Sequence, residues 1–174
     1  IDPKVVRATF NIESGGEAFG PEGKPIIRFE NHVFFDQLAN PVLYYKYFNH
    51  DSNVHSHRWR KDENSEWVEF HGNQKLEWQV YEFAKTLDES AASNSISMGM
   101  AQIMGFNYDD VGYLSSTHML NAFSQSGAPG YVAQVFAFFG FCLSRQGLMD
   151  HLRNKNWLQF ALIYNGAASY ANLL

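Results

Sequence analysis

The sequence predicts a mostly helical α+β domain with a small β hairpin element near its N-terminal third. Apolar residues recur at helical spacing in many segments, whereas residues 25–30 form a short run with the character of a strand. The chain has 174 residues, of which 45% are hydrophobic, and this length suits one core better than two. We therefore expect residues 1–174 to form a single domain.

The first third of the chain contains the expected strand between two helices. Residues 4–14 have one apolar side at helical spacing, with Pro3 suited to the first turn and a Gly pair to the end. The strand 25–30 follows a Gly- and Pro-rich turn, and Asn31 is suited to cap a helix through Leu38. Residues 44–66 show no sustained period, so we expect a long loop or an irregular hairpin.

The remaining chain is expected to be almost entirely helical. Leu76, Val80 and Leu87 belong to an amphipathic pattern that begins near Asn73, and Asp88 is suited to cap a second helix over residues 89–93. A compact turn that leads into a helix is expected over Ser97 to Met104. Further helices are expected over residues 117–124, 130–144, 148–154, 157–164 and from 169 onward.

Composition argues against several classes of partner. The net charge of −5, without a basic cluster, makes nucleic acid an unlikely partner. The longest apolar stretch, residues 131–143, is shorter than the roughly 20 residues that cross a bilayer, so we expect a buried helix and no membrane insertion. The single cysteine, Cys142, lies in this stretch and is expected to be a buried hydrophobic residue.

Two carboxylates are the first candidates for catalysis. Glu13 is expected at the C-terminal end of a helix, where the helix dipole and burial under aromatic rings would favour its protonated form. Glu30 is expected at the end of the strand, from which a hairpin could bring it opposite Glu13. Two carboxylates facing one cleft are the minimum for glycoside hydrolysis, although each could instead be an ordinary surface residue.

The histidines suggest a different site. His50, His55, His57 and His71, together with Asp51 or Glu63, could in principle hold zinc. Their spacing matches no closed zinc motif, so we expect solvated loop histidines, no bound metal and no cofactor. Nucleophilic catalysis is not indicated, since the chain has no Gly-x-Ser-x-Gly sequence and Cys142 lies among phenylalanines.

Three separated segments together resemble the lysozyme-like superfamily, which includes goose-type lysozymes and lytic transglycosylases. They are residues 13–16 (ESGG), 97–107 (SMGMAQIMGFN) and 164–166 (YNG). Residues 19–25 (FGPEGKP) and 28–35 (RFENHVFF) are more specifically similar to the N-acetylmuramidase domain of phage endolysins. The resemblance spans nearly the whole chain and implies a lysozyme-like fold that needs no cofactor.

The resemblance also implies roles for individual residues. Glu13 would be the catalytic acid and Glu30 the second carboxylate in cleavage of the β-1,4 bond between N-acetylmuramic acid and N-acetylglucosamine. The peptidoglycan glycan strand would be the partner, and action in the bacterial cell wall or periplasm is implied. The sugar-binding residues would be Ser97, Gln102, Tyr164 and Asn165, although Gln102 and Asn165 could also serve to cap their turns. Tyr108 is a further sugar-binding candidate, because pyranose faces stack on aromatic rings.

Several alternatives stay open. The product could be an anhydro sugar, as in a lytic transglycosylase, and the reaction could invert or retain the anomeric centre. The chain could also be a non-catalytic wall-binding module of a phage tail or secretion apparatus. It begins at Ile1 and shows no signal peptide, so we expect a piece of a larger protein whose targeting domain or delivery apparatus brings it to the wall.

Overall fold

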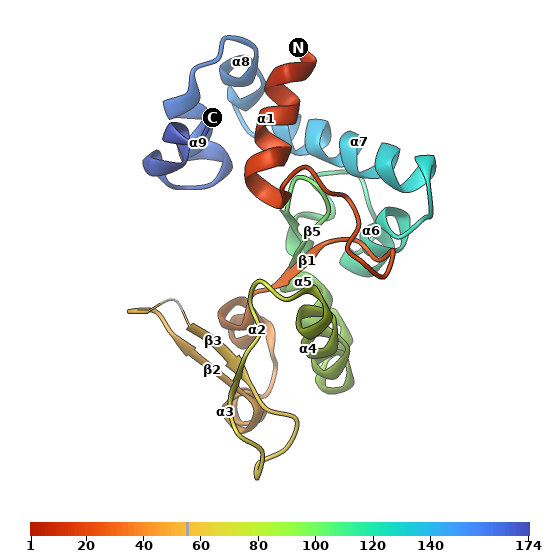
Figure 1. Cartoon of the computed structure of the whole chain (residues 1–174), viewed down its shortest axis with the longest axis vertical. Coiled ribbons are helices and arrows are strands. Elements are labelled where there is room, and N and C mark those ends of the chain that lie inside the picture. Colours follow the sequence, from red (N-terminus) through yellow and green to blue (C-terminus); the bar gives the residue numbers. More distant parts are fainter. Residues whose placement is uncertain (55) are drawn as a thin grey trace.

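The computed structural model describes residues 1–54 and 56–174, and it has two lobes joined by short strands (Figure 1). The upper lobe in Figure 1 contains α1 and α6–α9, and the lower lobe contains α2–α4 and β2–β4. The helices are α1 (Pro3–Ser14), α2 (Asn31–Gln37), α3 (Pro41–Tyr47), α4 (Gln74–Leu87), α5 (Glu89–Asn94), α6 (Ser116–Phe123), α7 (Ala128–Ser144), α8 (Leu148–Arg153) and α9 (Trp157–Tyr164). Two 3-10 helices are η1 (Gly105–Asn107) and η2 (Ala168–Asn172).

The strands form two antiparallel sheets of three strands each. The first, ordered β1-β5-β6, lies between the lobes and consists of β1 (Ile27–Phe29), β5 (Ile96–Met98) and β6 (Ile103–Met104). The second, ordered β2-β3-β4, lies in the lower lobe and consists of β2 (Phe48–Asp51), β3 (Ser56–Trp59) and β4 (Val68–Glu69). The structure thus contains more β-sheet than the single small hairpin expected from the sequence. In addition, β1 pairs with β5, a strand almost 70 residues away, rather than with a near neighbour.

The ends of α1 follow from local sequence, as predicted. The Asp2 side chain accepts a hydrogen bond from the Lys4 amide at 2.9 Å, and Pro3 occupies the first turn, where its missing N–H costs nothing. Gly15 ends the helix in the left-handed conformation at φ 68°, which a residue without Cβ adopts freely. This end places Glu13 in the last turn of the helix.

Helices α4 and α5 also begin where their caps predict. The side chain of Asn73 accepts from the amides of Lys75 and Leu76, and the side chain of Asp88 accepts from the Ala91 amide. Asn31, by contrast, does not cap α2, because it is the first residue of that helix and is fully buried. Its amide group donates to the carbonyl of Asn49 at 2.9 Å, so it ties α2 to the second sheet instead.

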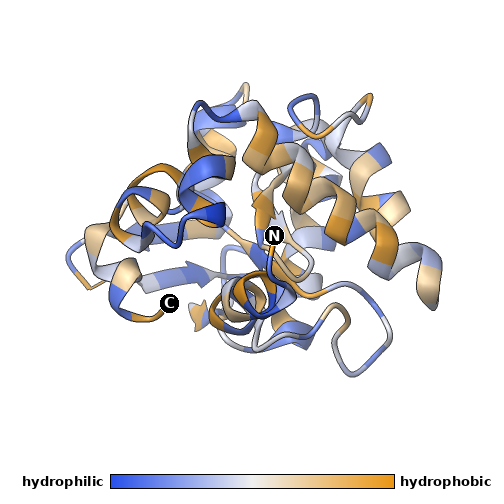
Figure 2. Ribbon diagram, turned by 90° about the horizontal axis from the view of Figure 1, so that it is seen from above, coloured by the Kyte–Doolittle hydropathy of each residue, from blue (hydrophilic) through white to orange (hydrophobic). Residues whose placement is uncertain are grey.

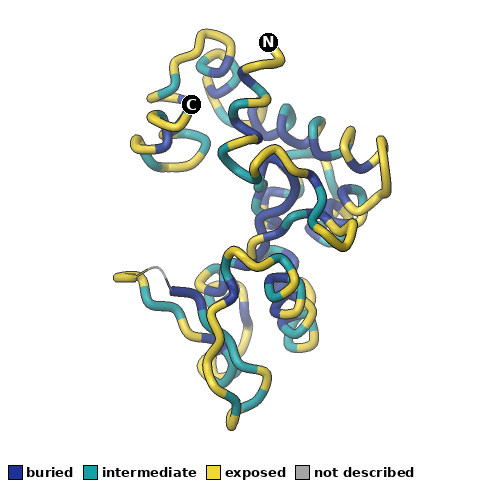
Figure 3. The backbone as a smooth tube through the Cα atoms, in the orientation of Figure 1, coloured by how far each residue is buried: buried dark blue, intermediate teal, exposed yellow. Residues whose placement is uncertain are grey.

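The core continues from one lobe into the other. In Figure 3 the buried backbone is concentrated around β1, β5 and the inner sides of the helices, while loops and chain ends are exposed. Apolar and polar residues accordingly alternate along most helices (Figure 2). Helix α7 is the expected core helix, with Phe138 and Cys142 fully buried, but its opposite side leaves Phe136 72% exposed. Among the described residues, no helix combines the length and apolar character that crossing a membrane requires.

One carboxylate lies inside this core. Glu77 on α4 is 1% exposed, and its Oε2 accepts a hydrogen bond from the Phe29 amide of β1 at 2.8 Å. Burial raises the pKa of Glu77 to about 8, because the charged form is poorly solvated there. Glu77 therefore joins α4 to β1 at Phe29, the residue before Glu30.

The segment 44–66 is the part that the sequence described least well. Its first residues complete α3, and the strands β2 and β3 that follow are antiparallel, in a register that pairs His50 with His57; residues 60–66 lie beyond β3 in turns and irregular backbone. Of the two alternatives, an irregular hairpin describes the outcome better than a long loop. The compact turn expected at Ser97–Met104 is likewise a β hairpin, which leads into η1 rather than into an α-helix.

Candidate active site

A cleft of about 450 Å³ brings together residues from nearly every part of the chain. Its walls come from the end of α1, the end of β1, the start of α2, the β5–β6 hairpin, η1, α7 and the end of α9. The lining residues are Glu13, Arg28, Glu30, His32, Val33, Ser97, Ala101, Gln102, Ile103, Met104, Phe106, Asn107, Phe141, Tyr164 and Asn165. Six of the seven residues that the sequence singled out are therefore in one cleft.

Glu13 is partly buried at the end of α1 and is held by a tyrosine from the C-terminal segment. The Tyr170 hydroxyl of η2 donates to Glu13 Oε1 at 2.6 Å. Burial raises the pKa of Glu13 to about 6, against the lowering effects of the Tyr170 hydrogen bond and of the Arg28 charge. The expected direction of this shift is confirmed, and burial is its main cause. A carboxyl with this pKa holds its proton in a useful fraction of molecules near neutral pH.

Glu30 follows β1 and precedes the first turn of α2. Its side chain is 16% exposed, and Arg28 Nε lies 2.9 Å from Glu30 Oε1. The backbone amide of Glu30 donates to the Ser95 carbonyl at 2.8 Å, which anchors this corner to the segment before β5. Glu30 thus reaches the cleft as half of an ion pair with Arg28, whereas Glu13 reaches it with the Tyr170 hydroxyl as its hydrogen-bond donor.

Ser97 and Gln102 shape the turn between β5 and β6. The Ser97 hydroxyl donates to Gln102 Oε1 at 2.8 Å, and Gln102 Nε2 donates to the Gly99 carbonyl at 2.8 Å. Gln102 itself has φ 47°, an unusual value for a residue other than glycine. The side chain of Gln102 therefore stabilises its own strained turn, which is the capping role considered from the sequence, while one side of it lines the cleft.

The tyrosines occupy different positions. The Tyr164 hydroxyl donates to the Ala101 carbonyl at 2.7 Å, so this ring both lines the cleft and holds the β5–β6 turn against α9. Asn165 directly follows α9 and has an exposed side chain that borders the cleft. Tyr108 does not belong to the lining and instead packs against the core.

Sequence reasoning missed several lining residues, among them Arg28, His32 and Phe106. Phe106 is 44% exposed, which is unusual for a phenylalanine and leaves its ring available to a ligand. It belongs to the segment 97–107 that carried the family resemblance, so its motif was the available signal. Arg28 and His32 belong to the quoted segment 28–35, and Arg28 also alternates with Glu30 on a short strand, so that both side chains point to the same side.

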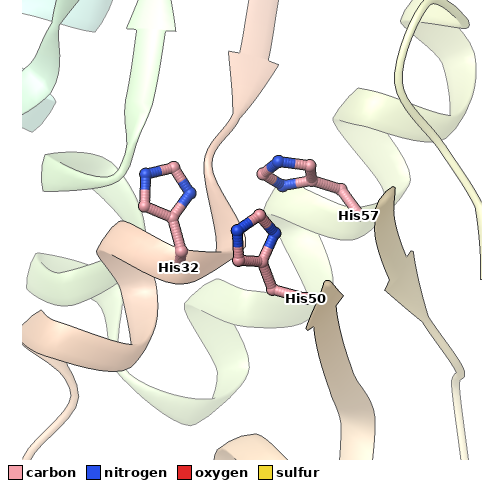
Figure 4. A group of neighbouring side chains, drawn as sticks. All are labelled: His32, His50 and His57. Carbon is pink, nitrogen blue, oxygen red and sulfur yellow. The ribbon is translucent and has the colours of Figure 1, made fainter. Parts of the chain in front are cut away.

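The histidines form a cluster beside Glu30 rather than a scatter of loop residues. His50 and His57 lie next to His32 (Figure 4), and the His71 ring stacks on that of His57 with centroids 3.9 Å apart. His57 is 4% exposed, so the expectation of a solvated residue is wrong for it, and its burial and neighbouring rings lower its pKa to about 3. His55 lies outside the described residues. The two carboxylates considered with them do not belong to the cluster: Asp51 accepts from the Asn53 amide, and Glu63 pairs with Lys46.

Comparisons with known proteins agree with this arrangement. The model of the N-acetylmuramidase family matches residues 2–173. A solved structure, the crystal structure of Burkholderia AP3 phage endolysin, superposes with a TM-score of 0.74 at 29% sequence identity. The match covers 99% of the present chain and 62% of the endolysin. A search of curated proteins gave no match. The fold is therefore a mostly α, lysozyme-like α+β fold, and the chain belongs to the N-acetylmuramidase family of glycoside hydrolases.

Proposed function

We propose that this chain cleaves the β-1,4 bond between N-acetylmuramic acid and N-acetylglucosamine in peptidoglycan, with Glu13 as general acid and Glu30 as the second carboxylate. The observation that carries the proposal is the contrast between these two groups in one cleft. Burial raises the pKa of Glu13 to about 6, whereas Glu30 forms an ion pair with Arg28 at 2.9 Å. A pair of carboxyl groups with different environments is what acid and base roles require.

In the proposed reaction, Glu13 gives its proton to the glycosidic oxygen as the bond to the muramic acid carbon breaks. The electrons of that bond stay with the leaving oxygen, and the sugar carbon develops positive charge. Glu30 then either takes a proton from an attacking water or stabilises the charged sugar. A carboxyl separation of about 6.5–9.5 Å leaves room for that water and gives inversion, whereas about 5–5.5 Å gives retention.

Sugar binding in this proposal uses surfaces of several kinds. The exposed side chain of Asn165 offers an amide to hydroxyl and N-acetyl groups, and the Phe106 ring offers a stacking face for a pyranose. Ser97, Gln102 and Tyr164 contribute wall atoms, but each also uses hydrogen bonds to hold the β5–β6 turn. Tyr108 is not included, because its ring lies outside the lining.

We further propose that residues 1–174 act as a single catalytic domain in the bacterial cell wall, delivered by other parts of a larger assembly. Support comes from the 62% coverage of the similar endolysin and from the net charge of −5, which gives no attraction to an anionic wall. Added salt should then leave binding to isolated sacculi unchanged or improve it. A steep loss of binding with salt would contradict this proposal.

Mass spectrometry of the soluble products from purified peptidoglycan tests the activity. The wild-type chain should release reducing muropeptides, Glu13→Gln should release none, and the matched control Glu17→Gln, at an exposed position four residues on, should behave like wild type. Anhydro-muropeptides would instead indicate a lytic transglycosylase, in which the 6-hydroxyl of muramic acid attacks in place of water. Binding to sacculi without release of any product would overturn the enzyme proposal in favour of a wall-binding module.

A further inference from the structure

Three histidines from three different elements meet at the edge of the cleft (Figure 4). His32 lies in the first turn of α2, and His50 and His57 are directly paired across β2 and β3. Their ring centroids are 5.0 Å apart for His32 and His50, 4.4 Å for His50 and His57, and 5.5 Å for His32 and His57. One nitrogen of each ring lies within 4.8 Å of a nitrogen of both others. The β2–β3 pairing keeps two of these rings together whatever the third one does.

The nitrogens of the three rings differ in what lies near them. His50 Nδ1 lies 3.2 Å from the Ser56 carbonyl. His32 Nδ1 and His57 Nε2 lie 3.6 and 3.8 Å from the same oxygen, Glu30 Oε2.

The remaining nitrogen of His57 is the most informative atom of the cluster. His57 is 4% exposed, and its Nδ1 is buried without a hydrogen-bond partner among the described residues. A buried polar atom without a partner is unfavourable, and such an atom in a native protein calls for an explanation. A metal ion that accepts its lone pair would supply one.

We propose that His32, His50 and His57 form a zinc-binding site at the edge of the cleft. Zinc takes neutral imidazole nitrogens at about 2.0–2.1 Å, which places neighbouring nitrogens of a tetrahedral site about 3.4 Å apart. The nitrogens must therefore approach one another slightly, and the His32 side chain, 47% exposed, is free to make that adjustment by rotation. The fourth position would be open to water or to a ligand, as the pattern of three protein ligands allows.

Glu30 fits this site as a supporting carboxylate. Histidines that bind zinc commonly donate their second ring N–H to a carboxylate, which orients the ring and strengthens it as a ligand. Glu30 Oε2 lies 3.8 Å from Nε2 of His57, the second nitrogen of a ring that would bind zinc through Nδ1, and 3.6 Å from Nδ1 of His32, so zinc bound by His57 would help to orient Glu30 as well. Zinc would then join α2 to the β2–β3 hairpin and fix a carboxylate of the cleft, whether or not that carboxylate takes part in catalysis.

A second combination, Glu30 with His57 and His71, is less suited to a metal. The rings of His57 and His71 stack at an angle of 23°, and the lone pairs of parallel rings lie in their own planes rather than pointing at a common centre. His71 Nε2 lies 3.0 Å from the Phe29 carbonyl, and Glu30 is already paired with Arg28. The first combination therefore carries the proposal.

Calorimetric titration of the chelator-treated, tag-free chain with zinc chloride tests the site. Wild type should bind about one zinc per chain, and the melting temperature should rise with zinc, since a ligand that binds only the folded state stabilises it. Loss of one ligand in His50→Asn or in the exposed His32→Asn should weaken zinc binding by about tenfold or more. His71→Asn tests the second combination, and His151→Asn, on α8 of the upper lobe, is the matched control; both should bind as wild type does.

Circular dichroism of each variant without metal establishes whether it is folded. If His50→Asn does not fold, the exposed His32→Asn variant provides the test of ligand loss. Absence of saturable zinc binding by the folded wild type would overturn the proposal. Retention of binding in both His50→Asn and His32→Asn, with loss in His71→Asn, would overturn it equally, because the metal would then lie at the second combination. These readouts do not depend on glycan cleavage, so the zinc site and the enzymatic proposal can fail separately.

Discussion

Replacement of Tyr170 by phenylalanine should raise the pKa of Glu13 and move the alkaline limb of the pH–activity profile upward. The Tyr170 hydroxyl donates to Glu13 Oε1 at 2.6 Å and stabilises its charged form, so it opposes the effect of burial. A hydrogen bond to a charged group contributes roughly 1.5–3 kcal/mol, which corresponds to about one to two pKa units as an upper range. Because Glu13 is only partly buried, we expect about one unit, from about 6 to about 7.

The sign follows from the role proposed for Glu13. The protonated acid is the active form, so activity is present below its pKa and declines as the pH rises through it. At pH 7 a carboxyl with a pKa of about 6 is protonated in about a tenth of molecules, and one with a pKa of about 7 in about half. The value of kcat/KM at pH 7 should therefore increase about fivefold in Tyr170→Phe if proton transfer itself is unchanged.

The assay is kcat/KM on soluble peptidoglycan fragments between about pH 4.5 and 8.5, where the free enzyme's limbs are observed. Tyr45→Phe, at a position 66% exposed on α3, is the matched control and should follow the wild-type profile. Thermal unfolding shows whether loss of the buried Tyr170 hydroxyl has changed the fold. An alkaline limb that stays in place, or that moves to lower pH in a folded variant, would refute the assignment of this limb to Glu13.

Three further predictions concern stability, measured as the free energy of unfolding in urea. Burial raises the pKa of Glu77 to about 8 in the folded protein, so its contribution to stability is fully present below the unfolded value of 4.5 and is lost as the pH rises through 8. The free energy of unfolding of the wild type should therefore fall by at most about 5 kcal/mol between these two pH values, and Glu77→Gln, which cannot ionise, should not show this fall. An equal fall in both proteins would disprove the prediction. Gly105→Ala should destabilise by about 1–3 kcal/mol, because its Cβ would lie 1.9 Å from the Ser93 carbonyl oxygen, and an unchanged stability would argue against that close approach. Phe138→Ala, at a fully buried position, should cost about 3–5 kcal/mol, whereas Phe136→Ala, 72% exposed on the same helix, should cost less than about 1 kcal/mol; similar losses would contradict the orientation of α7.

The helices could be predicted because their signals are local. A cap such as Asn73 or Asp88 acts on amides two or three residues away, and a C-terminal Gly15 acts on the turn before it. The β2–β3–β4 sheet could not be predicted in the same way, since its strands are only two to four residues long and mostly polar, and such strands show little periodicity. Asn31 does not act as the cap because α2 begins one residue earlier than expected, with Glu30 at the N-cap position, and the Asn31 amide nitrogen donates to the carbonyls of Asn49 and Arg58.

The residues of the candidate site also divide into those that the sequence identified and those that only the structure placed. The motifs that the sequence shares with the family identified Glu13, Glu30 and the β5–β6 turn, and all of them line one cleft. Arg28 and His32 line the same cleft and belong to the quoted segment 28–35, but nothing in that segment showed that their side chains face the cleft. Phe106 was inside a quoted motif, but only its 44% exposure distinguishes it from the core phenylalanines.

The sequence by itself determined the helical framework, the family and the two carboxylates, because each can be recognised from short segments of neighbouring residues. Only the tertiary structure decided how those groups behave. The pKa of Glu13 depends on burial and on Tyr170, which lies 157 residues away, and the burial of Glu77 depends on a strand from another segment. The histidine cluster likewise exists only after a helix and a hairpin have packed together. Solvation and distance between groups are properties of the packed chain, and they decide protonation and metal affinity.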